Sequence, residues 1–201
     1  IAAFFFTMLP IEIHPLPPFA PPHATLLMLG SFPPPRSRWK MDFYYPNFQN
    51  DMWRIFGLAF FNNKDHFLTA DKKAFEKTTI LDFLSERGIA LSDMGKEVKR
   101  LKGNASDNFL EIITPIDLKN ILERIPACTT LVTTGEKATE TLRSLLPDLI
   151  QKPPVGSFVE TLFEGKTYQF YRMPSSSRAY PKPVTEKARV YLRMFNELGI
   201  R

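Results

Sequence analysis

Short apolar runs alternate with amphipathic segments along this chain, and the alternation predicts strands separated by helices. A fully buried strand is expected at residues 25–29, and further strands at 89–92, 129–134 and 167–172, with a strand at 158–163 that turns into the last of them. Because helices separate most of these strands, we predict a parallel sheet that is covered on both faces. The expected fold class is α/β, a three-layer α/β/α sandwich with a central, mostly parallel four-stranded sheet.

Five segments carry the periodicity or the end signals of helices. They lie at residues 46–56, 71–87, 118–125, 136–146 and 184–198. Asn47, Asn50 and Arg54 fall on one face of the first helix, which is either a functional face or a solvated polar face. Asp117 is expected to cap the third helix, and Gly88 to end the second.

Basic side chains are predicted to face solvent at two places. In the last helix, basic positions lie opposite an apolar stripe that faces the core. The outward set is Lys187, Arg189 and Arg193, and the inward set is Ala188, Tyr191, Leu192 and Phe195. Residues 94–108 are expected to form a polar, basic loop that is solvated or touches phosphate, with Lys96, Lys99, Arg100, Lys102 and Gly103.

At 201 residues the chain is long enough for one domain with a substantial core, which we place at residues 26–201. Residues 1–25 are expected to form a proline-rich N-terminal extension that lies over the surface in extended or polyproline conformation. The first nine residues are apolar but too few to span a membrane, and no basic segment precedes them as in a signal peptide. We therefore expect added residues ahead of a start at Met8, no membrane association and a cytoplasmic monomer.

The composition favours a folded protein with an anionic partner. Hydrophobic residues make up 44% of the chain, which argues against disorder, and the net charge of +5 favours nucleic acid without requiring it. Cys128 is the only cysteine, which excludes a disulfide or a cysteine-ligated metal cluster within one chain, and a buried thiol is expected there. His14, His23 and His66 lack metal-binding spacing, so we expect no metal and no cofactor.

The most distinctive stretch runs from Gly30 to Gly57, where a strand leads into a loop rich in proline, cations, amides and aromatic residues. The last strand similarly leads into Met173-Pro174-Ser175-Ser176-Ser177-Arg178. In open α/β sheets, ligands bind outside the carboxyl ends of the strands, so we predict that these two loops line one cleft. Neither strand is followed by GxGxxG or GxxxxGK[ST], and the sequence therefore gives no support for a dinucleotide or NTP site.

Taken together and in order, the two loops resemble motifs of the uracil-DNA glycosylase superfamily. The first motif is Gly30-Ser31-Phe32-Pro33, followed by Tyr45 and by Asn50-Asp51-Met52-Trp53, and the second is the loop that begins at Pro174. The resemblance covers roughly residues 26–195 and implies a uracil-DNA glycosylase-like α/β fold. It is strongest to the mismatch-specific and hypoxanthine-acting branches, in which a YYxxPxNxFW-like segment occurs.

The resemblance implies a monofunctional DNA glycosylase that flips a deaminated base, uracil or hypoxanthine, out of DNA and hydrolyses its glycosidic bond. The catalytic residues that it implies are Asn50, Gly30 and Ser31. The base pocket that it implies consists of Phe32, Pro33, Tyr45 and Asn47, with the Tyr45 ring suited to stack on the base. The DNA contacts that it implies are Arg36, Arg38, Lys40, Pro174, Ser175, Ser176, Ser177 and Arg178.

Two positions differ from the family members that act strongly on uracil. Phe32 stands where those members carry Asp or Asn, and Met173 stands where they often carry His or Asn. Both differences argue against efficient uracil excision, and Asn50 is the candidate for the asparagine that the hypoxanthine-acting branch uses elsewhere. The alternative is a catalytically inactive nucleic-acid-binding module of the same fold. A third hypothesis, a hydrolase that uses the serines, is weaker because GxSxG and a later histidine are missing.

Overall fold

The computed structural model describes residues 9–102 and 106–201. Residues 1–8, which hold most of the apolar start of the chain, lie outside the described residues, and so does Gly103 of the predicted basic loop. No helix in the described part of the chain is long and apolar enough to cross a bilayer.

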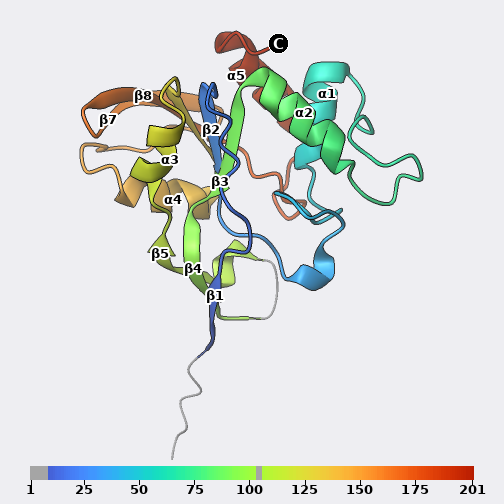
Figure 1. The fold of residues 1–201 in the computed structure, drawn as a ribbon, viewed down its shortest axis with the longest axis horizontal. Coiled ribbons are helices and arrows are strands. Elements are labelled where there is room, and N and C mark those ends of the chain that lie inside the picture. Colours follow the sequence, from blue (N-terminus) through green and yellow to red (C-terminus); the bar gives the residue numbers. More distant parts are fainter. Residues whose placement is uncertain (1–8, 103–105) are drawn as a thin grey trace, which may run out of the picture.

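The main sheet has five strands in the order β3-β2-β6-β8-β7 (Figure 1). Their bounds are β2 Leu26–Gly30, β3 Ile89–Asp93, β6 Thr130–Thr134, β7 Ser157–Phe163 and β8 Lys166–Met173. The first four strands in spatial order are parallel, whereas β7 runs antiparallel to β8. The prediction of a four-stranded central sheet therefore needs correction, because the β7–β8 hairpin adds an antiparallel edge and makes the sheet mixed. Glu164 and Gly165 both have positive φ, as a two-residue hairpin turn requires.

A second, antiparallel sheet of three strands has the order β1-β4-β5. Its strands are β1 Ile11–Ile13, β4 Gly95–Arg100 and β5 Leu110–Pro115. The prediction of a loop over residues 94–108 is thus wrong for its first part. Val98 is the buried apolar residue of β4 and polar residues surround it, so the strand carries too little apolar pattern to be recognised. The proline-rich segment supplies β1, which pairs with β4.

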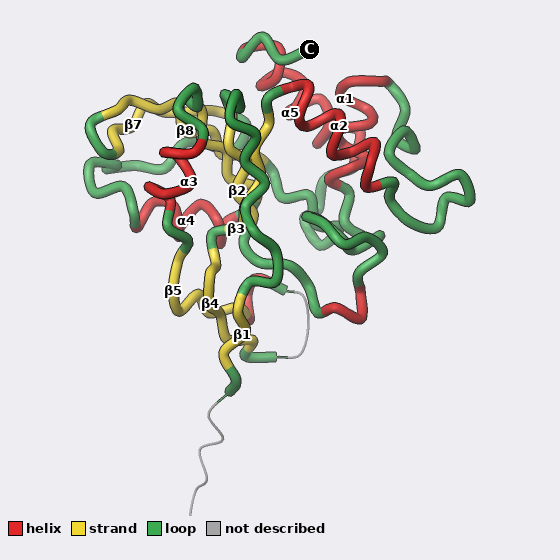
Figure 2. The backbone as a smooth tube through the Cα atoms, in the orientation of Figure 1, coloured by secondary structure: helices red, strands yellow, loops and turns green. Residues whose placement is uncertain are grey.

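Helices cover both faces of the main sheet (Figures 1 and 2). On one face lie α1 Met52–Phe61, α2 Lys77–Arg87 and α5 Val184–Glu197, and on the other lie α3 Leu118–Arg124 and α4 Glu136–Ser144. Alternation along β2 divides the core accordingly: Leu26 and Met28 pack with the first group of helices, and Leu27 and Leu29 with the second. Two short 3-10 helices, η1 Arg36–Arg38 and η2 Asp107–Phe109, lie in the loops.

The first two helices begin later than predicted. Residues 46–51 are held as a loop by isolated bridges from Asn47 to Trp39 and from Asn50 to Ser177, so α1 begins at Met52. Asn47, Asn50 and Arg54 therefore do not share a helical face. The helix also continues through Gly57, where the chain folds back so closely that an added Cβ would lie 2.3 Å from the Asn63 carbonyl oxygen.

The second helix begins at Lys77 instead of residue 71, because a bridge between Leu68 and Phe75 holds the preceding residues in a turn. It ends at Gly88 as predicted, with φ of 65°. The Asp117 cap is also confirmed: its carboxylate accepts from the backbone N–H of Asn120 at 3.0 Å.

The predicted faces of the last helix are wrong at two positions. Lys187, expected to face solvent, is only 1% exposed, and Leu192, expected to face the core, is 36% exposed. The Lys187 ammonium donates to the Ser177 carbonyl oxygen at 2.7 Å, so the loop that precedes α5 covers this side chain and supplies its partner. A helical pattern cannot reveal such a loop.

Candidate functional site

A cleft of about 880 Å³ opens at the carboxyl ends of the parallel strands. Gly30 ends β2, Asp93 ends β3, Thr134 ends β6, and Ser175 follows β8 closely; all four line the cleft. In a parallel sheet these ends meet at one edge, where the chain leaves backbone groups and side chains free to face a ligand.

The two loops that the sequence singles out lie side by side in this cleft. Tyr45 and Asn50 of the first loop line it together with Ser175, Ser176 and Ser177 of the second. The backbone N–H of Asp51 donates to the Ser176 carbonyl oxygen at 3.0 Å, next to the bridge between Asn50 and Ser177. Residues more than a hundred positions apart therefore form one continuous wall.

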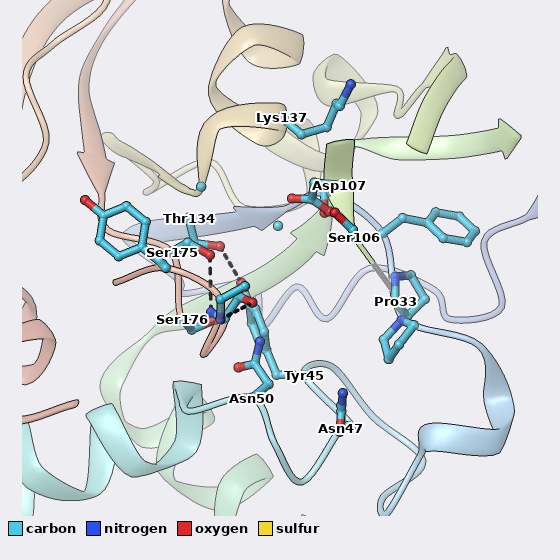
Figure 3. A pocket seen from close by; sticks show the side chains of 18 of the residues that line it. Pro33, Tyr45, Asn47, Asn50, Ser106, Asp107, Thr134, Lys137, Ser175 and Ser176 are labelled. Carbon is cyan, nitrogen blue, oxygen red and sulfur yellow. Dashed lines mark hydrogen bonds between the residues drawn. The ribbon is translucent and has the colours of Figure 1, made fainter. Parts of the chain in front are cut away.

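Tyr45 forms part of the floor of the cleft (Figure 3). Its ring is half-buried and meets Trp53 edge-on, with ring centroids 6.0 Å apart. Its hydroxyl lies 3.0 Å from the Thr134 hydroxyl, which ties the loop to the end of β6. Burial, followed by the charge of Asp93, raises the pKa of Tyr45, so its phenol is neutral at physiological pH. The backbone of Tyr45 is left-handed, with φ of 52°, an unusual conformation for an aromatic residue that aims its ring at the cleft.

The amides of Asn47 and Asn50 line the cleft, but each uses its side-chain oxygen locally. Asn50 Oδ1 accepts from the backbone N–H of Met52 at 2.9 Å, and Asn47 Oδ1 accepts from that of Gln49 at 3.0 Å. Asn50 thus helps to start α1, and its amide nitrogen is the group left to meet a ligand as a donor.

The turn after β2 is packed tightly against the neighbouring strand. Gly30 pairs with Asp93 in register, and an added Cβ at Gly30 would lie 2.3 Å from Asp93 Oδ1. Any larger residue here would force the Asp93 carboxylate to move. Ser31 is next, and its hydroxyl donates to Asp107 Oδ1 at 2.6 Å. Phe32 and Pro33 line the cleft beyond it, and their role as walls of a base pocket stays a prediction.

Asp93 and Asp107 are cleft residues that sequence reasoning missed. Asp93 is 6% exposed, and its Oδ2 lies 2.9 Å from His14 Nε2. Asp107 begins η2, and in Figure 3 its carboxylate lies across the cleft from Asn50. Burial raises the pKa of Asp107, opposed by the hydrogen bond from Ser31 and reinforced by the nearby charge of Asp93.

Asp93 could have been found from the sequence, because it directly follows a predicted parallel strand next to the Gly30 strand. Asp107 lies within residues 94–108, beyond the part that forms β4, and no sequence signal pointed to it.

The serine loop is shaped by its own hydroxyl groups. Ser175 Oγ accepts from the Ser177 backbone N–H at 3.2 Å, and Ser177 Oγ accepts from that of Ala179 at the same distance. Ser176 is buried, and so is Pro174, which does not line the cleft and whose carbonyl oxygen accepts from the Tyr191 hydroxyl. These bonds fix the loop, so its edge is a preformed surface.

The predicted DNA-contacting cations separate into two groups. Arg38 and Arg178 line the cleft, whereas Arg36 and Lys40 do not. Arg36 pairs with Asp42 at 2.7 Å and lies over the Trp39 ring at 3.9 Å, so its charge is already partly neutralised. Lys137, near the N-terminus of α4, adds a cation that the sequence did not predict.

No three His, Cys, Asp or Glu side chains within residues 9–102 and 106–201 are grouped so that they could hold a metal ion. Cys128 is buried, and burial raises its pKa to about 11, so its sulfur stays a protonated thiol away from the cleft.

Comparisons with known proteins find similarity among solved structures. No protein-family model matches the sequence, and no curated protein matches it. Among solved structures, the chain is similar to a protein from Methanosarcina acetivorans determined by solution NMR, whose assignment as a uracil DNA glycosylase is itself provisional. The two share 25% identity and a TM-score of 0.61 over 92% of this chain and 99% of that chain.

This chain is similar to a uracil-DNA glycosylase-like protein. The likeness supports the resemblance to the uracil-DNA glycosylase superfamily that was drawn from the Gly30 and Pro174 loops. The mismatch-specific and hypoxanthine-acting branches remain predictions.

Proposed function

We propose that this protein is a monofunctional DNA glycosylase that flips a deaminated base, uracil or hypoxanthine, out of DNA and hydrolyses its N-glycosidic bond. The observation that carries the proposal is the single cleft in which Tyr45, Asn50 and the serine loop meet at the carboxyl ends of the strands. Its volume of about 880 Å³ is within the range of small-molecule sites and large enough for one nucleotide.

The extruded base would stack on Tyr45. An aromatic side chain contributes about 1–3 kcal/mol per stacked base. The hydrogen bond to Thr134 holds the ring in position, and the raised pKa keeps the phenol uncharged against the base. Phe32 and Pro33 would form the apolar side of the pocket.

Breaking the glycosidic bond leaves negative charge on the departing base, so hydrogen-bond donors must face it. The Asn50 amide nitrogen is one such donor, because its amide oxygen already binds Met52. The backbone N–H groups of Ser31 and Phe32 are further candidates, at the point where β2 ends. Neither role needs a covalent nucleophile.

Water must supply the oxygen that replaces the base on the sugar, and a carboxylate can orient that water and take its proton. We assign this role to Asp107 because Asp93 is already paired with His14. The raised pKa of Asp107 brings it closer to the operating pH, as a general base requires. The C1′–N bond breaks, a C1′–O bond forms, and the water proton passes through Asp107 to the base.

The test is a base-release screen with uracil, hypoxanthine and xanthine in single- and double-stranded oligonucleotides. We expect abasic-site product from at least one of these bases, and its loss in Asn50→Ala. Turnover on none of the damaged bases would contradict the proposal.

A catalytically inactive nucleic-acid-binding module is the second candidate. It is favoured by Met173, which is 1% exposed and does not line the cleft, and which stands where members acting strongly on uracil often carry His or Asn. This candidate predicts salt-dependent DNA binding without base release. The same screen, run beside a binding titration, separates the two.

A further inference from the structure

A second cleft, of about 560 Å³, lies next to the first, and Arg178 lines both. Five basic side chains line it, against two carboxylates. The basic side chains are Arg54, Lys64, Lys72, Arg178 and Lys182, and the acidic ones are Asp51 and Asp65. The excess of positive charge favours an anionic ligand.

The ion pairs in this cleft leave positive charge uncompensated. Lys72 and Asp65 pair at 3.0 Å and cancel each other. Asp51 is shared by Arg178 at 3.0 Å and Arg54 at 3.5 Å, so one carboxylate faces two guanidinium groups. Within the part of the chain that the structure describes, neither Lys64 nor Lys182 forms an ion pair.

Two buried cations, Arg54 and Lys187, add to the positive charge around the second cleft. Arg54 is almost fully buried, with its guanidinium 4.5 Å from the Phe48 ring centre and bonded to the Phe48 and Asn50 carbonyl oxygens. Lys187 is buried beneath the serine loop, where its ammonium donates to the Ser177 carbonyl oxygen. Both positions are fixed by packing, so ligand binding would not need to order these side chains.

The loop between β8 and α5 lines both clefts. Residues 175–181 line the first cleft, and residues 182–184 line the second, so the loop between β8 and α5 runs along the two without interruption. A DNA strand carries one phosphate for every ~3.4 Å of helix rise. A strand whose extruded nucleotide enters the first cleft therefore has phosphates within reach of Arg178 and the basic side chains beyond it.

We propose that the second cleft binds the phosphate backbone of the damaged strand, directly beside the extruded nucleotide. This inference rests on the proposed function for its placement of the extruded base. It assigns Lys64 and Lys182, which no motif indicated, as phosphate-binding residues, with Arg178 as the link between the two clefts.

The test compares a double variant, Lys64→Gln with Lys182→Gln, against a control, Lys119→Gln with Arg124→Gln. Both pairs remove two positive charges, but the control residues lie on α3, on the opposite face of the main sheet. Binding of full-length protein to a hypoxanthine-containing duplex is measured over a range of salt concentrations. We expect about tenfold weaker binding in the double variant and a salt slope that is smaller by about two, with little change in the control.

Position on the DNA is tested with uncharged methylphosphonates placed singly along either strand. Substitution beside the hypoxanthine on its own strand should weaken binding of the wild type but not of the double variant. Equal salt slopes in the double variant and the control, or equal sensitivity of both proteins to every methylphosphonate, would overturn the inference. Base release is measured separately: its absence in the wild type would overturn the proposed function, whatever the slopes show.

Discussion

His14 Nε2 lies 2.9 Å from Asp93 Oδ2, although 79 residues separate them. Asp93 stands opposite Gly30 in the strand register and lines the candidate cleft. The His14 ring also meets Phe32 edge-on, with centroids 5.1 Å apart. The proline-rich segment before the first core strand therefore packs against the edge of the cleft and helps to position Asp93 and Phe32.

The first prediction concerns this contact. His14→Ala leaves the Asp93 carboxylate, only 6% exposed, without its partner, and should lower the free energy of unfolding by about 1–3 kcal/mol. Urea denaturation measures the change. His23→Ala is the matched control, because His23 is exposed and its ring nitrogen bonds the Ser85 carbonyl oxygen at the surface. If both variants lost the same free energy of unfolding, the buried contact between His14 and Asp93 would contribute no more stability than the surface contact of His23.

The apolar pattern was sufficient to predict the framework. The strands β2, β3 and β6 are buried at every position, and β8 is buried at Tyr168, Phe170, Tyr171 and Met173. The order of these four strands along the chain gives a parallel sheet between helices. The same rule about carboxyl strand ends placed Tyr45 and Ser175 at one site.

Other features depend on contacts that no local pattern records. The strand β4 has one buried apolar residue, Val98, and is held by pairing with β1 and β5. Asp107 reaches the cleft only because this second sheet returns the chain to Ser31. Lys187 is buried because the loop that precedes α5 folds over it and supplies its acceptor. Tertiary pairing decided each of these positions.

The second prediction concerns the close approach at Gly30. Gly30→Ala places a Cβ 2.3 Å from Asp93 Oδ1 and 3.3 Å from the Tyr45 hydroxyl, so both side chains must shift. We expect a loss of about 1–3 kcal/mol in the free energy of unfolding, together with impaired base release. Thermal or urea denaturation and the oligonucleotide assay measure the two effects.

The clash can be tested by removing the group that causes it. In an Asp93→Ala background, Gly30→Ala should cost less than in the wild type, because Oδ1 is gone. Gly199→Ala is the control for base release alone: an added Cβ meets nothing within 4 Å and Gly199 does not line the cleft, so base release should not change, although the positive φ of 69° means that alanine costs some stability there. If the losses in the free energy of unfolding from Gly30→Ala and Asp93→Ala simply added in the double variant, the steric explanation would be wrong.

The third prediction separates the ring of Tyr45 from its hydroxyl. Tyr45→Ala removes the stacking surface and should weaken binding of damaged DNA by about 1–3 kcal/mol. Tyr45→Phe keeps the ring and loses only the bond to Thr134, so base release should stay within a few-fold while stability falls by about 1 kcal/mol. Thr134→Val removes the same bond from the other side and should match Tyr45→Phe in stability. A Tyr45→Phe variant as inactive as Tyr45→Ala would assign the function to the hydroxyl.

The fourth prediction uses the raised pKa of Asp107, whose first cause is burial. Because the folded-state pKa of Asp107 lies above the unfolded value, the folded protein binds more protons than the unfolded chain at pH values between these two pKa values. The free energy of unfolding contributed by this group is therefore highest below the ordinary Asp pKa and falls as pH rises through the folded-state pKa. Asp107→Asn removes this dependence, so its stability relative to the wild type should improve across the same pH window. Denaturation midpoints at a series of pH values measure the trend.

Base release should change with pH and with Asp107→Asn in the direction opposite to the change in stability. If Asp107 takes the proton of the attacking water, Asp107→Asn loses about 10²–10⁴-fold in base release, and the wild-type rate rises with pH through the raised pKa. Asp42→Asn is the control, and its effect on the pH dependence of stability should have the opposite sign. The hydrogen bond from Arg36 lowers the pKa of Asp42, so the stability that this carboxylate contributes is lost as pH falls. Asp42 lies outside the cleft, so its variant should release base at the wild-type rate. An Asp107→Asn variant that gains stability at neutral pH yet keeps full activity would remove Asp107 from the reaction and leave it a purely structural carboxyl group beneath Ser31.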